Sequence, residues 1–446
     1  MISIDQTVVA VALEPMARSL GLTTFVTHGV VLVYILALAA FVPVGGMLVR
    51  RFGLLTAFRS GITVFALASG VCALAPHGDS AEPFLLTARA VQGIGAALLM
   101  PVGTALITEV YEERRRGKAL SVYAGLAQVF LVVGPIVGAF LTQLLGWRSV
   151  FLINVPVGAV SLWLMTRARL TNEPQGGPLS IMQPLLMVSS MVLLVLGLYQ
   201  CGNWGVADPR TLAALAAGAV TVAVGVRLLL RSPRPLVDLR LLRIRPYAVG
   251  VALTFLVQGP QLVVLVHGTL FLRQSMHLSL LATGIALLPL VVASATGTFL
   301  SGFLRDRTGS ARVPVLAGLT AATIGAAAWT VALPSQVYVW QVPGMILTGL
   351  GTGLPVPALS AELMRVVPAD KRADASVLRS TLRQLGGAIG LAVAGAVVLA
   401  VNNDLSDAVG IITPTATRAA FAVASAALAL ALSLAAFLLP REGRTR

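Results

Sequence analysis

The chain has 446 residues, of which 57% are hydrophobic and 11% charged, with a formal net charge of +15. Soluble domains carry about 25% charged residues, whereas apolar runs of about 20 residues recur along this chain, each long enough to cross a membrane as one helix. The composition excludes an ordinary soluble protein and predicts an all-α integral membrane protein.

Other classes fit the pattern poorly. Barrel strands would be about ten residues long with strict alternation, and these runs are longer and uniformly apolar. The basic residues lie at the ends of the runs, which favours a role in topology over a nucleic-acid surface. Cys72 and Cys201 and the four histidines show no disulfide or metal-ligand spacing. We therefore expect neither a metal nor a cofactor, and no nucleic-acid partner.

Fourteen spans are predicted, joined by loops too short to hold a soluble domain. They lie near residues 2–16, 26–49, 54–75, 84–109, 119–145, 148–166, 180–200, 209–230, 246–272, 279–304, 312–333, 337–364, 376–401 and 416–440. About fifteen residues precede Pro15, too few to cross about 30 Å at about 1.5 Å per residue. We therefore expect a truncated first helix and a natural start upstream.

Lysine and arginine are concentrated in alternate loops, with roughly 23 in one set of loops and the tail and 5 in the other. Basic loops stay in the cytoplasm, so the first set is predicted to be cytoplasmic. An even number of spans places both termini there as well. The predicted location is the cell membrane, with the lipid bilayer as surroundings.

An internal repeat divides the chain. The pattern G-x-L-x-x-R-x-G occurs at 46–53 and again at 302–309, each time where a span meets a loop. It predicts two six-helix halves, 1–170 and 246–446, with residues 171–245 forming a linking two-helix hairpin and a cytoplasmic loop. Such repeats are typical of secondary transporters, which bind their substrates between halves.

Arg89 lies about one turn into the fourth span from its outer end. A charge at the bilayer centre costs about 2.5–3.5 kcal/mol on insertion scales. Arg89 could face a cavity and pair with a substrate or a proton-carrying carboxylate, or it could extend outward to the interface. Gln92 on nearly the same face, followed by glycines that permit close packing, favours the functional interpretation.

Asp5 is an acid inside an otherwise apolar run. Burial disfavours its charged form and a nearby arginine favours it, which is the competition that a proton-coupled carrier requires. The alternative is that Asp5 only caps the shortened helix. Glu14, next to Pro15, is expected to be exposed at the outer rim.

The fifth span contains Gly125, Gly134, Pro135 and Gly138. Proline kinks a helix, and small residues let a neighbouring helix approach closely. A hinge and a purely structural kink explain this pattern equally well.

A polar pathway is predicted to include Tyr34 and Gln92 in the first half. In the ninth span, Gln258, Gln261 and His267 could extend it, although hydrogen bonding between helices is slightly favoured. In the thirteenth span Arg379 and Arg383, four residues apart, are expected to reach the cytoplasmic interface.

Taken in order, these motifs resemble the major facilitator superfamily, and within it the fourteen-span drug:proton antiporter branch. The segments that carry the resemblance are 5–13, 85–93, 125–138, 146–158 and 383–387. The resemblance implies a helical bundle that works by alternating access, Asp5 and Arg89 as proton-coupling residues, and a monomer that exports small molecules.

The sequence departs from this pattern at the predicted cytoplasmic gate, where Arg50 stands in place of the family's aspartate. The first-helix motif also has Ala10 and Glu14 in place of asparagine and proline. The second copy of the loop keeps its acid, so we expect a weaker lock on the inner side or a different one. The predicted gate residues are Gly46, Arg50, Arg51, Gly53, Asp306, Arg307, Gly309 and Arg383.

The favoured function is proton-coupled export of drugs or related amphipathic molecules, typical of bacterial antibiotic resistance. Alternatives are a non-transporting paralogue that acts as a sensor or scaffold, and a nutrient symporter. A primary pump would need a phosphate-binding G-x-x-x-x-G-K-[ST] loop, and an enzyme a clustered nucleophile and base. The sequence contains neither, so no enzymatic activity is predicted.

Overall fold

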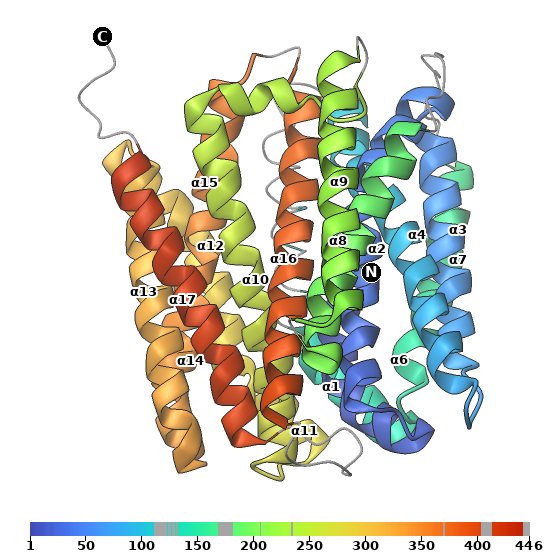
Figure 1. Ribbon diagram of the computed structural model, residues 1–446, viewed down its shortest axis with the longest axis vertical. Helices are drawn as coiled ribbons and strands as arrows, with labels where there is room; N and C mark the ends of the chain where they lie inside the picture. Colours follow the sequence, from blue (N-terminus) through green and yellow to red (C-terminus); the bar gives the residue numbers. More distant parts are fainter. Residues whose placement is uncertain are drawn as a thin grey trace. The chain divides into compact units, whose positions relative to one another are not determined.

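The structure is a computed structural model (Figure 1), and it describes residues 1–110, 133–167, 182–205, 207–232, 235–368, 371–402 and 413–439, with Tyr123, Leu126 and Phe130 between the first two ranges. Over these residues the regular secondary structure is helical. The helices of the first part of the chain are α1 (Ile2–Leu20), α2 (Thr24–Phe52), α3 (Leu54–Ala73), α4 (Ala81–Val110), α6 (Ser149–Leu152), α7 (Asn154–Arg167), α8 (Met182–Trp204) and α9 (Pro209–Arg231). The later ones are α10 (Arg245–Gln274), α11 (Leu280–Ala286), α12 (Leu288–Thr308), α13 (Arg312–Ala332), α14 (Tyr338–Gly353), α15 (Pro355–Val366), α16 (Arg372–Asn402) and α17 (Pro414–Leu438), with short 3₁₀ turns at Leu239–Arg243 and Leu333–Ser335.

Twelve spans in the described part of the chain are long and apolar enough to cross a bilayer. They coincide with the second to fourth and the sixth to fourteenth predicted spans. Of the remaining two, the first is α1, which carries three charged residues, and the fifth is described only from residue 133, as the helix Val133–Leu145. The chain is an all-α, multi-pass membrane protein.

The predicted end of the first span is wrong. Helix α1 has 19 residues and continues through Pro15 to Leu20, where Gly21 caps it in a left-handed conformation (φ 67°). A proline removes one hydrogen bond without ending the helix, and neighbouring groups in membrane proteins compensate for the loss. At about 1.5 Å per residue, α1 is about 28 Å long, close to the thickness of the hydrocarbon core.

The helices form two compact units. Unit 1 comprises residues 1–194 and 215–237, and unit 2 comprises residues 195–214 and 238–446. The α8–α9 hairpin is therefore shared between the units. The division into two six-helix halves with a separate linking hairpin stays a prediction.

In unit 1, α4 packs against both α2 and α3 (Figure 1). Gly93 and Gly95 make this possible, because a Cβ atom at Gly93 would lie 2.8 Å from Cβ of Ala37 on α2, and one at Gly95 would lie 2.8 Å from Cα of Phe65 on α3. These two glycines set the close spacing of the three helices.

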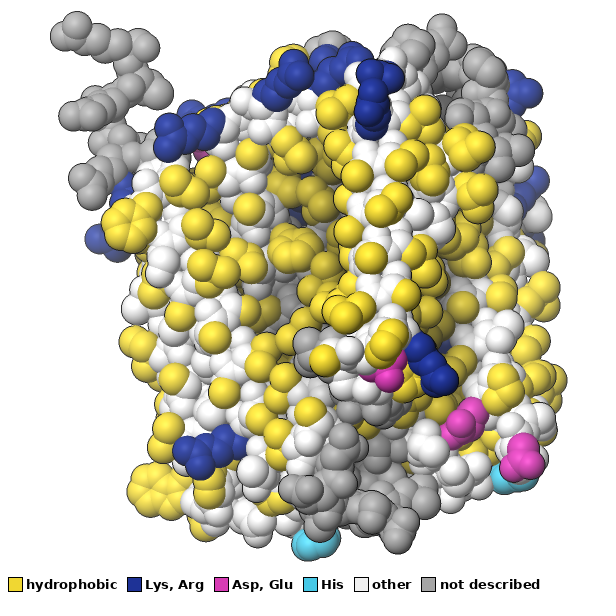
Figure 2. All heavy atoms as spheres, in the orientation of Figure 1, with side chains coloured by type: hydrophobic (Ala, Val, Ile, Leu, Met, Phe, Trp, Pro, Cys, Tyr) yellow, Lys and Arg dark blue, Asp and Glu magenta, His cyan; other side chains and the backbone are white. Residues whose placement is uncertain are grey.

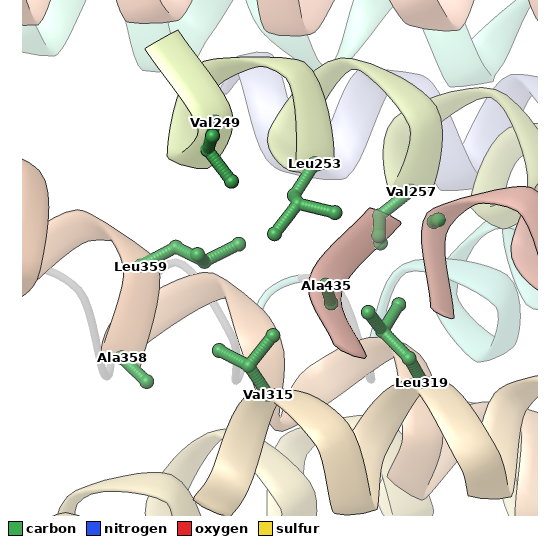
Figure 3. Packing of buried hydrophobic residues seen from close by; sticks show 9 residues of the cluster. Val249, Leu253, Val257, Val315, Leu319, Ala358, Leu359 and Ala435 are labelled. Atoms are coloured by element: carbon green, nitrogen blue, oxygen red, sulfur yellow. The ribbon is translucent and has the colours of Figure 1, made fainter. Parts of the chain in front are cut away.

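In unit 2, apolar side chains from four helices meet in a core (Figure 3). Helix α10 contributes Leu253 and Val257, α13 contributes Val315 and Leu319, and residues of α15 and α17 complete the cluster. Leu253, Val315 and Leu319 are fully buried. Burial of such side chains stabilises the unit by about 1.5–3 kcal/mol each in water, whereas in lipid the gain comes mainly from close packing.

The outer surface is also apolar. Figure 2 shows hydrophobic side chains along the exposed faces of the helices and arginine or lysine near helix ends. On α9, Leu212, Val220 and Val224 have 52%, 62% and 49% of their surface exposed. An apolar surface of this extent is unfavourable in water and suits contact with lipid.

Both copies of the repeat end a helix at a glycine with positive φ. Gly53 (φ 84°) ends α2, and Gly309 (φ 68°) ends α12. Positive φ is strained for other residues, which explains the last glycine of each motif. The guanidinium of Arg51 lies 6.0 Å from the Phe52 ring; Gly46 is buried within α2 and Arg307 is exposed. The side chains of Arg50 and Asp306 lie outside the described residues, so the altered gate stays a prediction.

The glycine contacts between α10 and α16 yield a stability prediction. A Cβ at Gly386 would lie 2.8 Å from the backbone carbonyl carbon of Phe255, whereas nothing lies within 4 Å of one at Gly302. Overpacking costs about 1–3 kcal/mol, so Gly386→Ala should lower the thermal unfolding temperature in detergent. Gly302→Ala is the matched control and should leave it unchanged or raise it slightly, because a helix-interior glycine is itself unfavourable. Equal effects would contradict the packing account.

Candidate functional site

A buried ion pair lies at the centre of unit 1. Arg89 Nη1 on α4 donates to Asp5 Oδ2 on α1 at 2.9 Å, and the two residues are 0% and 1% exposed. Neither side chain has access to water that could solvate its charge. Each therefore depends on the other, since removing one member of a buried pair costs about 3–5 kcal/mol.

Two amide side chains also donate hydrogen bonds to Asp5, and a serine hydroxyl connects them. Gln92 Nε2 donates to Asp5 Oδ1 at 2.9 Å, and Asn154 Nδ2 donates to the same oxygen at 3.4 Å. Both amides also donate to Ser69 Oγ at 3.0 Å, and that hydroxyl donates to the carbonyl of Phe151 at 2.9 Å. Side chains of α1, α3, α4 and α7 and a carbonyl of α6 thus meet in one connected hydrogen-bond network.

Arg89 has further partners that do not depend on Asp5. Its Nε donates to the carbonyl of Val30 at 3.1 Å, and its Nη1 donates to Gln92 Oε1 at 2.5 Å. Its guanidinium carbon lies 4.3 Å from the ring centroid of Tyr34 and 5.6 Å from that of Phe151. Aromatic faces stabilise cations, most strongly in dry surroundings, so the site can hold a positive charge by itself.

Close helix packing positions these groups. A Cβ at Gly138 would lie 2.9 Å from the carbonyl oxygen of Val8, and one at Gly134 would collide with Thr7 Oγ1, so the helix Val133–Leu145 lies directly against α1 beside Asp5. On the other side, a Cβ at Gly158 would lie 2.7 Å from Cβ of Ala66. This second contact brings α7 against α3.

Four of the predicted residues lie together: Asp5, Arg89, Gln92 and Tyr34. Arg89 is fully buried and paired, so the alternative that it extends outward is wrong. The carboxylate of Asp5 accepts hydrogen bonds from side chains of other helices, which a simple helix cap would not do. Tyr34 is fully buried, and its hydroxyl has no hydrogen-bond partner among the described residues.

Of the remaining expectations for unit 1, the one for Glu14 is wrong and the one for the hinge is not tested. The expected rim exposure of Glu14 is wrong: the residue is 3% exposed and pairs with Arg18 Nε at 2.5 Å, because α1 continues past Pro15 and keeps that turn packed. Gly125 lies outside the described residues. Pro135 is buried, and its role as a hinge stays a prediction.

Sequence reasoning missed Ser69 and Asn154 as members of the site. Ser69 is one hydroxyl in an apolar span, where a bond to its own helix backbone is the ordinary expectation. Asn154 lies inside the predicted sixth span, in the segment 146–158 that served only for the family resemblance, whereas in the structure it begins α7. A signal did exist, since a buried ion pair needs further hydrogen bonds to its remaining lone pairs.

The polar residues of α10 lie in unit 2. Gln258 Oε1 accepts from Arg383 Nε on α16 at 2.6 Å, which confirms the interhelical bond favoured for Gln258. Gln261 has a buried Oε1 with no partner among the described residues, and His267 is buried with Nδ1 3.1 Å from the carbonyl of Val263. Arg383 thus contacts the middle of α10 through Nε, and the expectation that Arg379 and Arg383 reach the cytoplasmic interface stays a prediction.

Known proteins resemble the chain along most of its length. It is 28% identical to a methylenomycin A resistance protein of Bacillus subtilis, covering 89% of this chain and 85% of that protein. It is 30% identical to a tetracenomycin C resistance and export protein of Streptomyces glaucescens, covering 89% and 73%. The crystal structure of a D-xylose-proton symporter has the same fold, with a TM-score of 0.68 and 16% identity, covering 100% of this chain and 96% of that one.

The sequence profile of the Major Facilitator Superfamily matches residues 1–391. This match covers most of the chain and agrees with the membrane-spanning helices and with the fold of the solved transporter. The protein is therefore a member of the major facilitator superfamily, as its ordered motifs predicted.

Proposed function

We propose that this protein is a proton-coupled antiporter that exports amphipathic small molecules by alternating access, acting as a monomer with both termini in the cytoplasm. The observation that carries the proposal is the fully buried pair of Asp5 and Arg89. A titratable acid isolated from water and held by a cation is costly in a membrane protein. It is of use to a carrier because gain or loss of one proton changes the charge of the site.

Two charge states of the site follow from its hydrogen bonds. With Asp5 charged, its oxygens accept from Arg89, Gln92 and Asn154. When Asp5 takes a proton, the attraction between the pair is lost. Arg89 then keeps the Val30 carbonyl, Gln92 Oε1 and the Tyr34 ring. Protonation can thus loosen α1 from α4 without leaving the arginine unpartnered, which links proton binding to a movement of helices.

The relatives support an export direction, because one is named for resistance to an antibiotic and another for resistance and export. The helix Val133–Leu145 supports it too, because it carries Gly134, Pro135 and Gly138 of the segment that resembles the antiporter branch. The symporter shares the fold at low identity and leaves the direction of transport open. Uptake driven by inward proton flow is the second outcome that the experiment below distinguishes.

The first prediction concerns coupling. In cells that lack their own exporters, the protein should expel a fluorescent dye, and an uncoupler should abolish this efflux. Asp5→Asn should remove the effect of the proton gradient, because the site then keeps one charge state. Asp79→Asn is the matched control, since Asp79 lies exposed in the loop before α4 and should retain activity.

Three results would contradict the coupling proposal. Gradient-dependent efflux by Asp5→Asn would show that another group carries the proton. Uptake in place of efflux would indicate symport. Absence of transport over a broad dye and drug panel, with the protein folded in the membrane, would favour a sensor or scaffold.

The second prediction concerns the interdependence of the pair. Arg89→Gln leaves the Asp5 carboxylate buried without its cation, which should destabilise the protein by about 3–5 kcal/mol. The double variant Asp5→Asn with Arg89→Gln removes both charges and should recover much of the thermal stability, without recovering coupling. Thermal unfolding in detergent measures the first effect and dye efflux the second. Additive destabilisation in the double variant would show that the two charges do not stabilise each other.

A further inference from the structure

Two arginines of unit 2 have no neutralising carboxylate among the described residues. Arg379 and Arg383 lie four residues apart on α16, on one face of that helix. Arg383 Nε donates to Gln258 on α10 at 2.6 Å, and Arg379 Nη1 donates to Ser360 Oγ on α15 at 3.0 Å. Both acceptors are uncharged. The two guanidinium groups therefore have hydrogen-bond partners, but these partners do not neutralise their positive charges.

The described residues offer these arginines no acid. Among the described residues of unit 2, the ion pairs are Arg365 with Glu362 and Lys371 with Asp238, and neither includes Arg379 or Arg383. Of the acids in the described helices of this unit, Asp306 and Asp374 lie in end turns, and Glu362 is paired with Arg365. Two positive charges therefore remain on this face of α16.

Both charges lie inside the apolar span of α16, Asp374–Val401. At about 1.5 Å per residue, Arg383 is about 14 Å and Arg379 about 8 Å along the helix axis from Asp374, compared with a hydrocarbon thickness of about 30 Å. Each buried charge costs about 2.5–3.5 kcal/mol on insertion scales, and like charges four apart on a helix repel each other. Such a pair is strongly unfavourable unless an anion joins it.

The surrounding packing holds this pair in a defined position. Gly386 and Gly390 follow Arg383 on the same side of α16, and a Cβ at Gly259 on α10 would lie 3.0 Å from the carbonyl oxygen of Gly386 and 3.1 Å from Cα of Gly390. This contact fixes α10 against α16. Gln258, which is 4% exposed, consequently has a fixed place beside Arg383.

Donors remain available on both guanidinium groups. Arg379 Nε is buried and has no acceptor among the described residues. The terminal nitrogens of Arg383 also have no acceptor there, and both side chains keep part of their surface exposed. Guanidinium groups bind carboxylate, sulfonate and phosphate through paired hydrogen bonds, so the missing partner has the chemistry of an oxyanion.

We propose that Arg379 and Arg383, with Gln258 and Ser360 orienting them, bind the anionic group of the exported molecule. The substrates are then amphipathic organic anions, such as aromatic carboxylates or sulfonates. This inference rests on the proposed transport function and specifies its substrate class. Asp5, a buried carboxylate of unit 1 that could attract a cationic drug, is already neutralised by Arg89.

Two dyes of related structure and opposite charge test this proposal. Fluorescein is an anion, and rhodamine 123 is a cation built on the same xanthene core. The purified full-length protein is placed in phosphatidylcholine nanodiscs, and binding of each dye is followed by fluorescence polarisation. Arg383→Gln and Arg379→Gln should each weaken fluorescein binding at least about tenfold, as expected for loss of a charged hydrogen bond. Rhodamine 123 binding should stay unchanged or tighten, and Arg383→Lys should fall between Arg383→Gln and the wild type for fluorescein.

Gln258→Glu gives a second, independent test. It places a carboxylate where Gln258 Oε1 now accepts from Arg383, so it should weaken fluorescein binding although the helices stay joined. Matched controls are Arg365→Gln, which removes an exposed arginine of α15, and Gln336→Glu, which adds the same charge in an exposed turn. Both controls should bind fluorescein like the wild type.

Several results would overturn the proposal. These are failure of the wild type to bind fluorescein below about 1 mM, equal loss of both dyes in the arginine variants, and no loss of fluorescein in Arg383→Gln and Arg379→Gln. Nanodiscs that contain the anionic lipid phosphatidylglycerol test whether the arginines bind a lipid headgroup in place of a soluble anion. If this lipid weakens wild-type fluorescein binding as much as Arg383→Gln does, the site binds a lipid headgroup.

The binding assay needs no proton gradient, so it separates the two proposals. Loss of coupled efflux in Asp5→Asn tests the proton site, and selective loss of fluorescein binding in Arg383→Gln tests the anion site. Selective loss of fluorescein in Arg383→Gln together with gradient-independent efflux would leave the anion site standing and refute proton coupling. Coupled efflux of rhodamine 123 by a wild type that does not bind fluorescein would support proton coupling and refute the anion site.

Discussion

The absence of water around the buried charges is the constraint on which the rest of this structure depends. In a medium of low dielectric constant a charge that finds no partner costs several kcal/mol. Unit 1 meets this constraint inside the protein: Asp5 and Arg89 neutralise each other, and amides and a hydroxyl take up the remaining hydrogen bonds. Such a network has low energy only while every member stays in place, so a change of one proton affects several helices at once.

Unit 2 meets the same constraint differently. Arg379 and Arg383 have polar partners but no counter-charge among the described residues. A carrier that had to bind an anion and release it again could not place a permanent acid there, because the acid would compete for the same guanidinium groups. The uncharged Gln258 orients Arg383 without neutralising it. The two units thus differ in the counter-charge of their arginines. In unit 1 it is a permanent side chain, Asp5, and in unit 2 it is the anionic group of the substrate.

The sequence predicted well what depends on the chain locally. Twelve spans follow from hydropathy, and the glycines that end α2 and α12 follow from their repeated motif. Asp5 and Arg89 were identifiable because charges stand out in apolar runs. The bond between Gln258 and Arg383 was not assigned, and neither was the role of Ser69, because each depends on which helices are neighbours. Spacing along one helix defines a face but not the helix that lies opposite.

Glycines in the sequence help to decide which helices become close neighbours. Gly93, Gly138 and Gly386 have no functional group, and each lies where another helix passes too closely for a larger residue. Side chains of ordinary length reach across such contacts, so Asp5 meets Arg89 and Gln258 meets Arg383 within hydrogen-bond distance. A larger residue at one of these positions would separate the helices and leave a charge without its partner. Small residues therefore matter to the chemistry of this transporter as much as the charged ones do, since they decide which charges can meet.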